Sequence, residues 1–321
     1  MAQRLRLGLI GAGPWGQVYA RTLEQFRARG RLTHVATRTA HPIAWLPSGA
    51  VRTTRWQELL RICDAVFIAV PPRAHSVVLE ACLAARVPCV IEKPLCLDAR
   101  TAIRLSRLAG ASNRVLVNHP QLFSPAYERL RQGLRRSGRV RAAVSESLGP
   151  GPFRRDVPAL WDYAPHDVSL LLDVFGALPR RVAALSGPGN QWGMPERVAL
   201  RLEFHGGRTG WAHAGTLAAE KRRQLTIWAD RECWHWDALA PRPLTVSKFP
   251  FARRYVADRP ALGAPVPVSD RAMPMERMLR YFFDGLDSGD RRRFGLGLAV
   301  EVVRVLSAAE RSLRTGRPVA L

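Results

Sequence analysis

Lysine is nearly absent from the sequence: three lysines, Lys93, Lys221 and Lys248, stand against 46 arginines. The arginines bring the formal net charge to +23, a value that would suit a nucleic-acid partner because cationic side chains release counterions from phosphates. They are spread along the whole chain, however, and no zinc finger, RNP motif or basic region joined to heptads accompanies them. We therefore expect no nucleic-acid partner, and an anionic small molecule remains compatible with the charge.

Cysteine is also scarce, and its spacing argues against a structural role. The five cysteines form an odd number, contain no CxxC pair and are not accompanied by histidines at zinc-binding spacing. A disulfide framework and a metal site are therefore not expected. The cysteines fit small, reduced residues of the protein core.

Long apolar runs are missing as well. No stretch approaches the roughly 20 apolar residues of a membrane span, and the apolar run near the N-terminus is too short for the core of a signal peptide. We therefore expect a cytoplasmic protein without a membrane partner. Its 321 residues, of which 47% are hydrophobic, predict about two globular domains.

A glycine loop between a strand and a helix opens the chain. Residues 4 to 10 have the pattern of a strand, and they lead through GAGPWG into a segment with helical spacing. In a dinucleotide-binding loop the first glycine allows the tight turn, the second admits the pyrophosphate and the third lets the helix pack closely. The helix N-terminus then offers N–H groups to the phosphates; the alternative is a glycine-rich turn without a ligand. The residues expected to contact the cofactor are Gly11, Gly13, Pro14, Trp15 and Gly16.

The end of the second predicted strand bears on the choice of cofactor. NAD enzymes usually place Asp or Glu about twenty residues past the glycine loop, where it binds the ribose 2'-hydroxyl. Here Thr37 and Arg38 occupy that place, and a hydroxyl followed by a guanidinium can bind a 2'-phosphate that a carboxylate would repel. The sequence therefore favours NADP over NAD, although a chain so rich in arginine can place Arg38 there by chance.

Strands and helices alternate through the first 120 residues. Apolar runs near residues 64 to 70, 89 to 92 and 115 to 119 alternate with helical segments, which predicts a doubly wound parallel sheet of the Rossmann type. Ligands bind such sheets at the carboxyl ends of the strands. We therefore expect Pro71, Glu92, Lys93 and Asn118 near the cofactor. Asn118 and the adjacent His119 are equally compatible with a buried polar strand end.

The second half has a different pattern. In RVALRLEF, GRTGWAHAGTL, RQLTIWAD and ECWHWDA, apolar and polar residues alternate with period two, which predicts a mostly antiparallel, open sheet covered by helices on one face. The other face is a candidate subunit interface. Residues 240 to 269, rich in proline and arginine, are predicted to form a long loop, and helices are predicted at 275–286 and 296–313. The fold class is thus α/β followed by α+β.

The segment DVPALWDYAPHDVSLLLDVFG contains a candidate catalytic pair. Pro165 fits a helix only in its first turn, so the helix should begin near residues 162 to 164. Asp162 and His166 are four residues apart and share a face, and the helix dipole favours an ionised Asp162 and a neutral His166 that can act as a general base. An Asp cap with an incidental histidine is the equally weighted alternative. Arg154 and Arg155 precede the helix, and we favour surface solvation over substrate contact for both.

Four motifs, in order, resemble one known family. GLIGAGPWG, AVPPRAH, EKPL and WDYAPHD are similar to motifs of the Gfo/Idh/MocA oxidoreductases, named after glucose-fructose oxidoreductase and inositol dehydrogenase. The resemblance implies a Rossmann NAD(P)-binding domain over residues 1–120. It also implies a substrate-binding and oligomerisation domain over residues 121–321, whose open sheet forms homodimers or homotetramers. The family's EKP lysine matches Lys93, and its acid–histidine pair matches Asp162 and His166.

The resemblance also implies an activity. Hydride would pass between NADP or NAD and a secondary alcohol or ketone of a sugar, cyclitol or nucleotide-linked sugar, with Lys93, Asp162 and His166 as the catalytic residues. LFSPAYERL and LGPGPFRRDVPALWD resemble the branch that acts on nucleotide-linked sugars. Two alternatives stay open: a family member that reduces a non-sugar substrate such as a diol or a tetrapyrrole, and a regulator that binds NADP without turnover.

The proposed catalytic role explains why residue 93 is a lysine in a chain that nearly always uses arginine. Arginine's planar fork suits bidentate anions, whereas a compact ammonium can fit beside a single reacting oxygen. Pro94 restricts the two residues before it from continuing into a helix, so Lys93 should project from a defined strand end.

Overall fold

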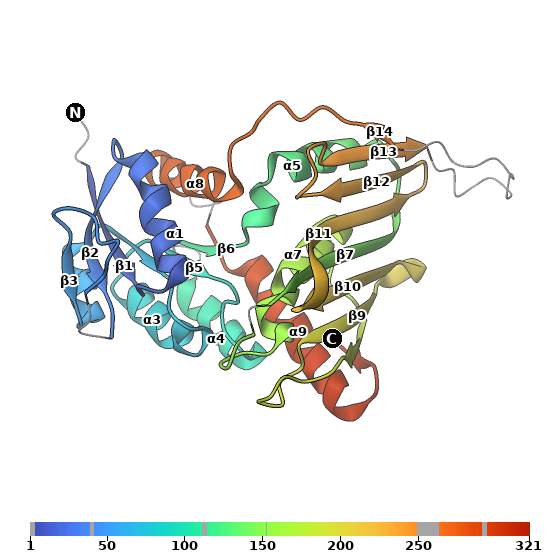
Figure 1. The fold of residues 1–321 in the computed structure, drawn as a ribbon, viewed down its shortest axis with the longest axis horizontal. Coiled ribbons are helices and arrows are strands. Elements are labelled where there is room, and N and C mark those ends of the chain that lie inside the picture. The colour runs from blue at the N-terminus through green and yellow to red at the C-terminus, as the bar shows by residue number, and fades with distance from the viewer. Residues whose placement is uncertain (1–3, 39–41, 111–113, 152, 249–262, 291–293) are drawn as a thin grey trace, which may run out of the picture. The chain divides into compact units, whose positions relative to one another are not determined.

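The computed structural model describes residues 4–38, 42–110, 114–151, 153–248, 263–290 and 294–321. The chain forms two compact units (Figure 1). The first contains Met1–His119 and Met275–Val300, and the second contains Pro120–Pro274 and Glu301–Leu321. The expected boundary at residue 120 is therefore the first of three points at which the chain passes from one unit to the other.

The first unit is built on a parallel sheet, as predicted. Its six strands lie in the order β3-β2-β1-β4-β5-β6, and all neighbouring pairs are parallel. This is the strand order of a doubly wound dinucleotide-binding fold. The strands are β1 (Leu5–Ile10), β2 (Gly30–Ala36), β3 (Val51–Thr53), β4 (Ala65–Ile68), β5 (Cys89–Glu92) and β6 (Val115–Asn118).

Helices cover this sheet and are supplied from two distant parts of the chain. They are α1 (Pro14–Leu23), α2 (Leu59–Ile62), α3 (Pro72–Ala84), α4 (Ala99–Ala109) and α8 (Pro274–Ser288). The side chain of Asp98 caps α4 by accepting a hydrogen bond from the Thr101 N–H at 2.8 Å. Helix α8 completes the core, because Phe283 stacks on Phe26 at 5.4 Å and Phe282 lies edge-on to Phe67 at 5.8 Å.

The second unit is built on a sheet of nine strands. Their order is β14-β13-β12-β11-β7-β10-β9-β8-β15, and every neighbouring pair is antiparallel except β10 with β7. The strands are β7 (Val140–Pro150), β8 (Arg181–Ser186), β9 (Arg197–Glu203), β10 (Thr209–Gly215), β11 (Leu217–Ala229), β12 (Glu232–Asp237), β13 (Leu244–Lys248), β14 (Ala264–Pro265) and β15 (Val319–Ala320).

The period-two pattern places apolar side chains on one face of this sheet, as predicted. In β9 the side chains of Val198, Leu200 and Leu202 are buried, whereas Arg197 and Arg201 are exposed. The helices of the unit are α5 (Pro125–Leu134), α6 (Ala159–Asp162), α7 (Ala164–Phe175) and α9 (Gly297–Thr315). Helix α7 packs on β7 and β10, and α9 reaches β8, where Ser312 Oγ accepts a hydrogen bond from the Ala184 N–H at 3.0 Å.

The prediction of one long loop over residues 240 to 269 was wrong in part. Leu244–Lys248 forms β13, which pairs with β12, and Ala264–Pro265 forms β14 at the edge of the sheet. The prolines on either side made the short period-two pattern look like a loop. Proline is nevertheless compatible with an edge strand, because the N–H groups on the outer side of that strand pair with no neighbour. The remainder of the predicted loop, residues 249–262, lies outside the described residues.

The described residues contain neither a helix that could span a membrane nor a cluster of metal-binding side chains. In the described residues no helix is long and apolar enough to cross a membrane. The same residues hold no cluster of three His, Cys, Asp or Glu side chains placed to bind a metal ion. All five cysteines are free thiols, and four of them are buried.

Candidate functional site

The glycine loop between β1 and α1 is shaped by two close approaches. Gly11 has a φ of +113°, and a Cβ atom there would clash with the carbonyl oxygen of Ala69. A Cβ atom at Gly16 would clash with the carbonyl oxygen of Gly11. Gly13 differs from both, because a Cβ atom there would meet nothing within 4 Å. The first and third glycines therefore set the turn, and the second leaves the backbone open.

The start of α1 fits a pyrophosphate. The helix begins at Pro14 with Gly13 as its N-cap, and no side chain caps it and no acidic residue lies in its first turn. Its first N–H groups therefore keep their capacity to donate, and the dipole favours an anion. Pro14 and Trp15 are exposed beside this turn, and Trp15 is 42% exposed.

The two residues predicted near the ribose follow β2 directly. The Thr37 N–H donates to the Thr53 carbonyl oxygen at 3.0 Å, which holds the backbone at this strand end. The side chain of Thr37 is half-buried, and Arg38 is exposed. Neither position offers a carboxylate to the ribose.

The carboxyl ends of β5 and β6 hold a buried polar cluster. Glu92 and Asn118 are directly paired across the two strands, and Asn118 Nδ2 donates to Glu92 Oε1 at 2.6 Å. Burial raises the pKa of Glu92, although Asn118 and the Lys93 charge oppose the shift. Tyr19 of α1 adds a buried hydroxyl, and its pKa is raised well above the usual range by burial and by Glu92. The sequence reasoning missed Tyr19, whose only signal is a polar atom on the buried face of α1.

Lys93 follows this cluster at the end of β5. It is half-buried, and its peptide bond to Pro94 is cis. The imidazole of His119 is 4% exposed, and neither ring nitrogen has a hydrogen-bond partner in the described residues. Burial and the Lys93 charge lower the pKa of His119 from 6.5 to about 4, so this ring is neutral near pH 7.

A buried histidine links the segments that follow β4 and β5. The Nε2 atom of His75 lies 2.9 Å from the Val70 carbonyl oxygen, and its Nδ1 atom lies 2.7 Å from the Pro94 carbonyl oxygen. Val70 precedes Pro71, which is exposed at the start of α3, and Pro94 follows Lys93. The AVPPRAH and EKPL motifs are thus held together by one side chain.

The predicted catalytic pair lies in the second unit. Helix α7 begins at Ala164 with Pro165 in its first turn, as predicted, and half-buried His166 is its third residue. Asp162 is the last residue of the preceding helix α6, and Tyr163 joins the two helices in a right-handed helical conformation.

Arg154 is not solvated in the way the sequence suggested. Its Nη1 atom donates to Asp162 Oδ1 at 3.2 Å, and its Nη2 atom donates to Asp156 Oδ2 at 2.6 Å. It thus binds one of the predicted catalytic residues. Arg155 is exposed and lies 4.6 Å from the centre of the Trp192 ring. Asp156 lies only two residues from Arg154, whereas the bond to Asp162 requires the chain to fold back over eight residues and has no local sequence signal.

Asp167, the neighbour of His166, was also missed. It is fully buried, and its Oδ1 atom accepts a hydrogen bond from Ser145 Oγ of β7 at 2.6 Å. Burial raises the pKa of Asp167 from 3.8 to about 7, and hydrogen bonds from Ser145 and Ser147 and the charge of Arg223 only partly oppose this. The available signal was a carboxylate within the apolar stretch of α7.

Comparisons with known proteins agree with the fold of the two units. Residues 5–119 match the family model described as an oxidoreductase family with an NAD-binding Rossmann fold. UDP-N-acetylglucosamine 3-dehydrogenase of Acidithiobacillus ferrooxidans is 31% identical over 234 residues, which cover 71% of this chain and 72% of that protein. An inositol 2-dehydrogenase of Cereibacter sphaeroides is 29% identical over 177 residues, about half of each chain (52% and 53%).

A solved structure extends the likeness to the whole chain. An oxidoreductase from Magnetospirillum magnetotacticum has 32% sequence identity and a TM-score of 0.85, and the match covers 96% of this chain and 100% of the other. The Rossmann unit, its glycine loop and these relatives define an oxidoreductase with an NAD-binding domain. The chain belongs to the Gfo/Idh/MocA family.

The two glycines of the α1 turn differ in their expected sensitivity to substitution. Gly16→Ala should lower the free energy of unfolding by about 1–3 kcal/mol, because the added methyl group overlaps the Gly11 carbonyl oxygen and the helix must shift. Gly13→Ala should cost less, at most about 1 kcal/mol, since its φ of −74° suits alanine and the space is open, and only the poorer N-cap preference of alanine opposes the change. Urea unfolding of both variants measures this, and equal losses would contradict it.

Asp167 and His119 should make opposite contributions to stability between about pH 4 and pH 7. The raised pKa of Asp167 means that its stabilising effect is present at low pH and is lost as the pH rises toward about 7. The lowered pKa of His119 means that its effect is present above its ordinary pKa of 6.5 and is lost as the pH falls toward about 4. The two slopes partly cancel in the wild-type protein.

Single substitutions should expose each slope. The free energy of unfolding of Asp167→Asn, relative to wild type, should rise by up to roughly 4 kcal/mol between pH 4 and pH 8. The reason is that Asp167 must ionise in a buried site as the pH rises, whereas an amide does not ionise. His119→Gln should show a difference of the opposite sign. Urea unfolding at four or more pH values would measure both, and a pH-independent difference for Asp167→Asn would contradict the assignment.

Proposed function

We propose that this protein is an NAD(P)-dependent dehydrogenase or ketoreductase that acts on a secondary hydroxyl of a nucleotide-linked sugar. One observation carries the proposal: Lys93 projects from the carboxyl end of β5 in a parallel sheet, the edge at which such sheets bind ligands. The relative named UDP-N-acetylglucosamine 3-dehydrogenase supports the substrate class. Oxidation of an alcohol also requires a general base and a group that orients it, and His166 and Asp162 of the second unit are proposed for these roles.

The roles of these residues follow from their chemistry. When bound, the nicotinamide would supply the hydride acceptor for oxidation of the carbinol carbon, or the hydride donor for reduction of the ketone. His166 removes the hydroxyl proton as a general base, and Asp162, itself bound by Arg154, orients the imidazole. The ammonium of Lys93 donates a hydrogen bond to the oxygen on which negative charge develops.

The glycine loop and the strand ends are proposed to bind the cofactor. Gly11, Gly13 and Gly16, with Pro14 and Trp15, would hold the pyrophosphate at the start of α1. Thr37 and Arg38 would bind the ribose, and we favour NADP because neither position carries a carboxylate. Pro71, Glu92 and Asn118 would contribute near the nicotinamide, Glu92 and Asn118 as the bonded pair that supports Lys93.

A cyclitol is the second candidate substrate. Several inositol 2-dehydrogenases are relatives at 27–30% identity, and a cyclitol presents the same secondary alcohol to His166. The two candidates differ in charge, since only a nucleotide-linked sugar carries a diphosphate. The high positive charge of this chain supports the nucleotide-linked sugar.

The second unit is proposed to bind the substrate and to form the subunit interface. The sheet face opposite α7 carries half-buried Trp211 and Trp228 and the contact of His213 with Glu146 at 3.6 Å. A homodimer or homotetramer through this face would cover the aromatic side chains. We also propose a cytoplasmic location, which is supported by the nicotinamide cofactor and by five unpaired thiols.

The activity can be tested by following the absorbance of reduced nicotinamide. UDP-sugars, free sugars and cyclitols would be assayed with NADP and with NAD, and we expect turnover with at least one UDP-sugar. His166→Ala should then lower kcat by about 100-fold to 10,000-fold and leave cofactor affinity nearly unchanged.

The matched control is His205→Ala, which removes an exposed histidine of the same unit that lies in a turn between β9 and β10. It should leave kcat unaltered. Unchanged turnover in His166→Ala would remove His166 from the mechanism. Cofactor binding without turnover of any substrate would favour a nucleotide-binding regulator.

Cofactor preference should depend on Arg38. Arg38→Ala should weaken NADP binding about ten-fold or more and change NAD binding little, because it removes a charge-assisted bond that only the 2'-phosphate can make. Titration of protein fluorescence with each reduced cofactor measures the ratio. The exposed Arg61→Ala of α2 serves as the charge-matched control, and equal losses for NADP and NAD would refute the 2'-phosphate contact.

A further inference from the structure

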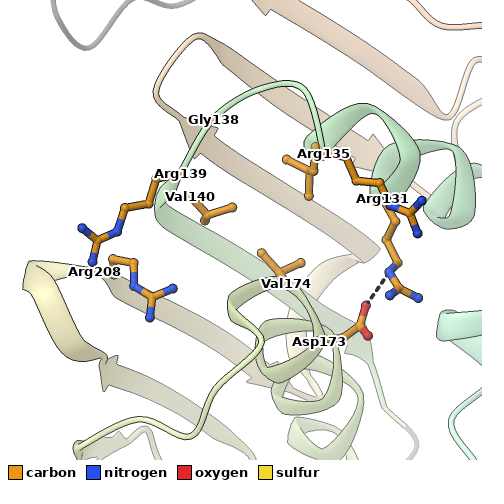
Figure 2. Close-up of a pocket in the computed structure, with 9 residues that line it drawn as sticks. Arg131, Arg135, Gly138, Arg139, Val140, Asp173, Val174 and Arg208 are labelled. Carbon is orange, nitrogen blue, oxygen red and sulfur yellow. Dashed lines mark ion pairs between the residues drawn. The ribbon is translucent and has the colours of Figure 1, made fainter.

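The second unit has a hollow whose nine lining residues include four arginines, and no step proposed above uses it. Its volume is about 350 Å³, within the range of small-molecule sites. Four arginines line it, Arg131, Arg135, Arg139 and Arg208, together with a single carboxylate, Asp173 (Figure 2). The hollow therefore has a formal excess of three positive charges.

The position of the hollow separates it from the proposed catalytic residues. It lies beside the C-terminal end of α7, where Asp173 and Val174 line it. His166 lies in the first turn of the same helix. Seven residues of helix place Asp173 about 10 Å from His166 along the axis.

Only one of the four arginines is paired with the carboxylate of the hollow. Arg131 Nε lies 3.1 Å from Asp173 Oδ2, and the same oxygen accepts a hydrogen bond from the Tyr127 hydroxyl at 2.6 Å. Asp230 is close to Arg139, but it accepts from the Arg139 main-chain N–H and from Arg141 Nε. Asp230 therefore binds the main chain of Arg139, and the guanidinium of Arg139 lies at the hollow.

Two guanidinium groups converge on one backbone carbonyl. Arg208 Nε and Arg139 Nη2 both donate to the carbonyl oxygen of His205, at 3.1 Å and 3.4 Å. Arg208 also donates to the Phe175 carbonyl oxygen at 3.2 Å, so it caps α7 as well. Two guanidinium groups that bind the same oxygen lie close together and repel each other. An anion bound by both groups would reduce this repulsion.

The backbone at Gly206 makes room for Arg139, because a glycine there leaves the space that the guanidinium occupies. Gly206 has a φ of +72°, and a Cβ atom there would clash with Arg139 Nη2. Half-buried Arg208 is further held over the Phe175 and Phe204 rings, at 5.6 Å and 5.9 Å from their centres. Fixed guanidinium groups lose little freedom when they bind a ligand.

The arrangement of the arginines around the hollow suits an anion with several charged groups. Figure 2 shows Arg139 and Arg208 on one side and Arg131 and Arg135 on the other, with Val140 and Val174 between them. An anion with several phosphoryl groups has oxygen atoms enough to bind more than one guanidinium, and each guanidinium can bind a phosphoryl oxygen pair through its planar fork.

We propose that this arginine hollow is a binding site for a small, multiply charged oxyanion of the polyphosphate class, separate from the cofactor site. It would be a second ligand site of the enzyme. Its occupancy places negative charge at the ends of α5 and β7 and neutralises the converging arginines.

Inorganic triphosphate is the probe, titrated by calorimetry into the full-length protein saturated with NADPH, so that the glycine loop is occupied. We expect one saturable site per chain. The double variant Arg135→Gln/Arg139→Gln should bind about ten-fold or more weaker, because two charge-assisted bonds are lost.

The matched control is Arg129→Gln/Arg181→Gln, which removes two exposed arginines of the same unit that lie outside the hollow. It should bind as wild type does. Equal weakening in both double variants would mean attraction to the overall charge only and would overturn the proposal. Unweakened binding in the hollow variant, or binding that NADPH abolishes, would overturn it too. An unchanged unfolding midpoint shows that each variant is folded.

Discussion

The first unit depends on the close approach of α1 to the end of β1. Because Gly16 has no side chain, its Cα can lie against the Gly11 carbonyl, and the helix start comes to the same edge as the strand ends. The next turn of α1 then places Tyr19 on Phe67, with ring centres 5.5 Å apart, and close to Glu92. The absence of a side chain at Gly16 thus brings the turn proposed to bind the pyrophosphate close to the polar cluster that precedes Lys93.

Local periodicity was enough to predict most of the architecture. Alternating strand and helix patterns gave the parallel sheet, because each pattern is set by which side chains of a single segment are buried. The same logic identified the buried face of β9 from Val198, Leu200 and Leu202. Pro165 located the start of α7 since proline is tolerated only in the first turn of a helix. β13 was not predicted, because a strand of five residues between prolines is too short to show a clear period-two pattern.

Partnerships between distant residues could not be predicted from the sequence. Arg154 with Asp162, Ser145 with Asp167, and Asn118 with Glu92 are separated by 8, 22 and 26 residues. The Ser145 and Asn118 pairs form because the fold buries two polar groups together, and a buried polar group without a partner is costly. The Arg154 pair is only partly buried and joins opposite charges. The strand-end rule pointed to Glu92 and Asn118 separately, but their pairing needed the parallel register of β5 and β6.

The route of α8 affects how the protein is made. Phe282 and Phe283 complete the core around Phe67 and Phe26, yet they are synthesised more than 150 residues after β6. At usual translation speeds the nascent sheet waits roughly ten to thirty seconds for them. During that interval Phe26 and Phe67 lack their aromatic partners from α8, so the synthesis of residues 275–300 governs when the core of the first unit is completed.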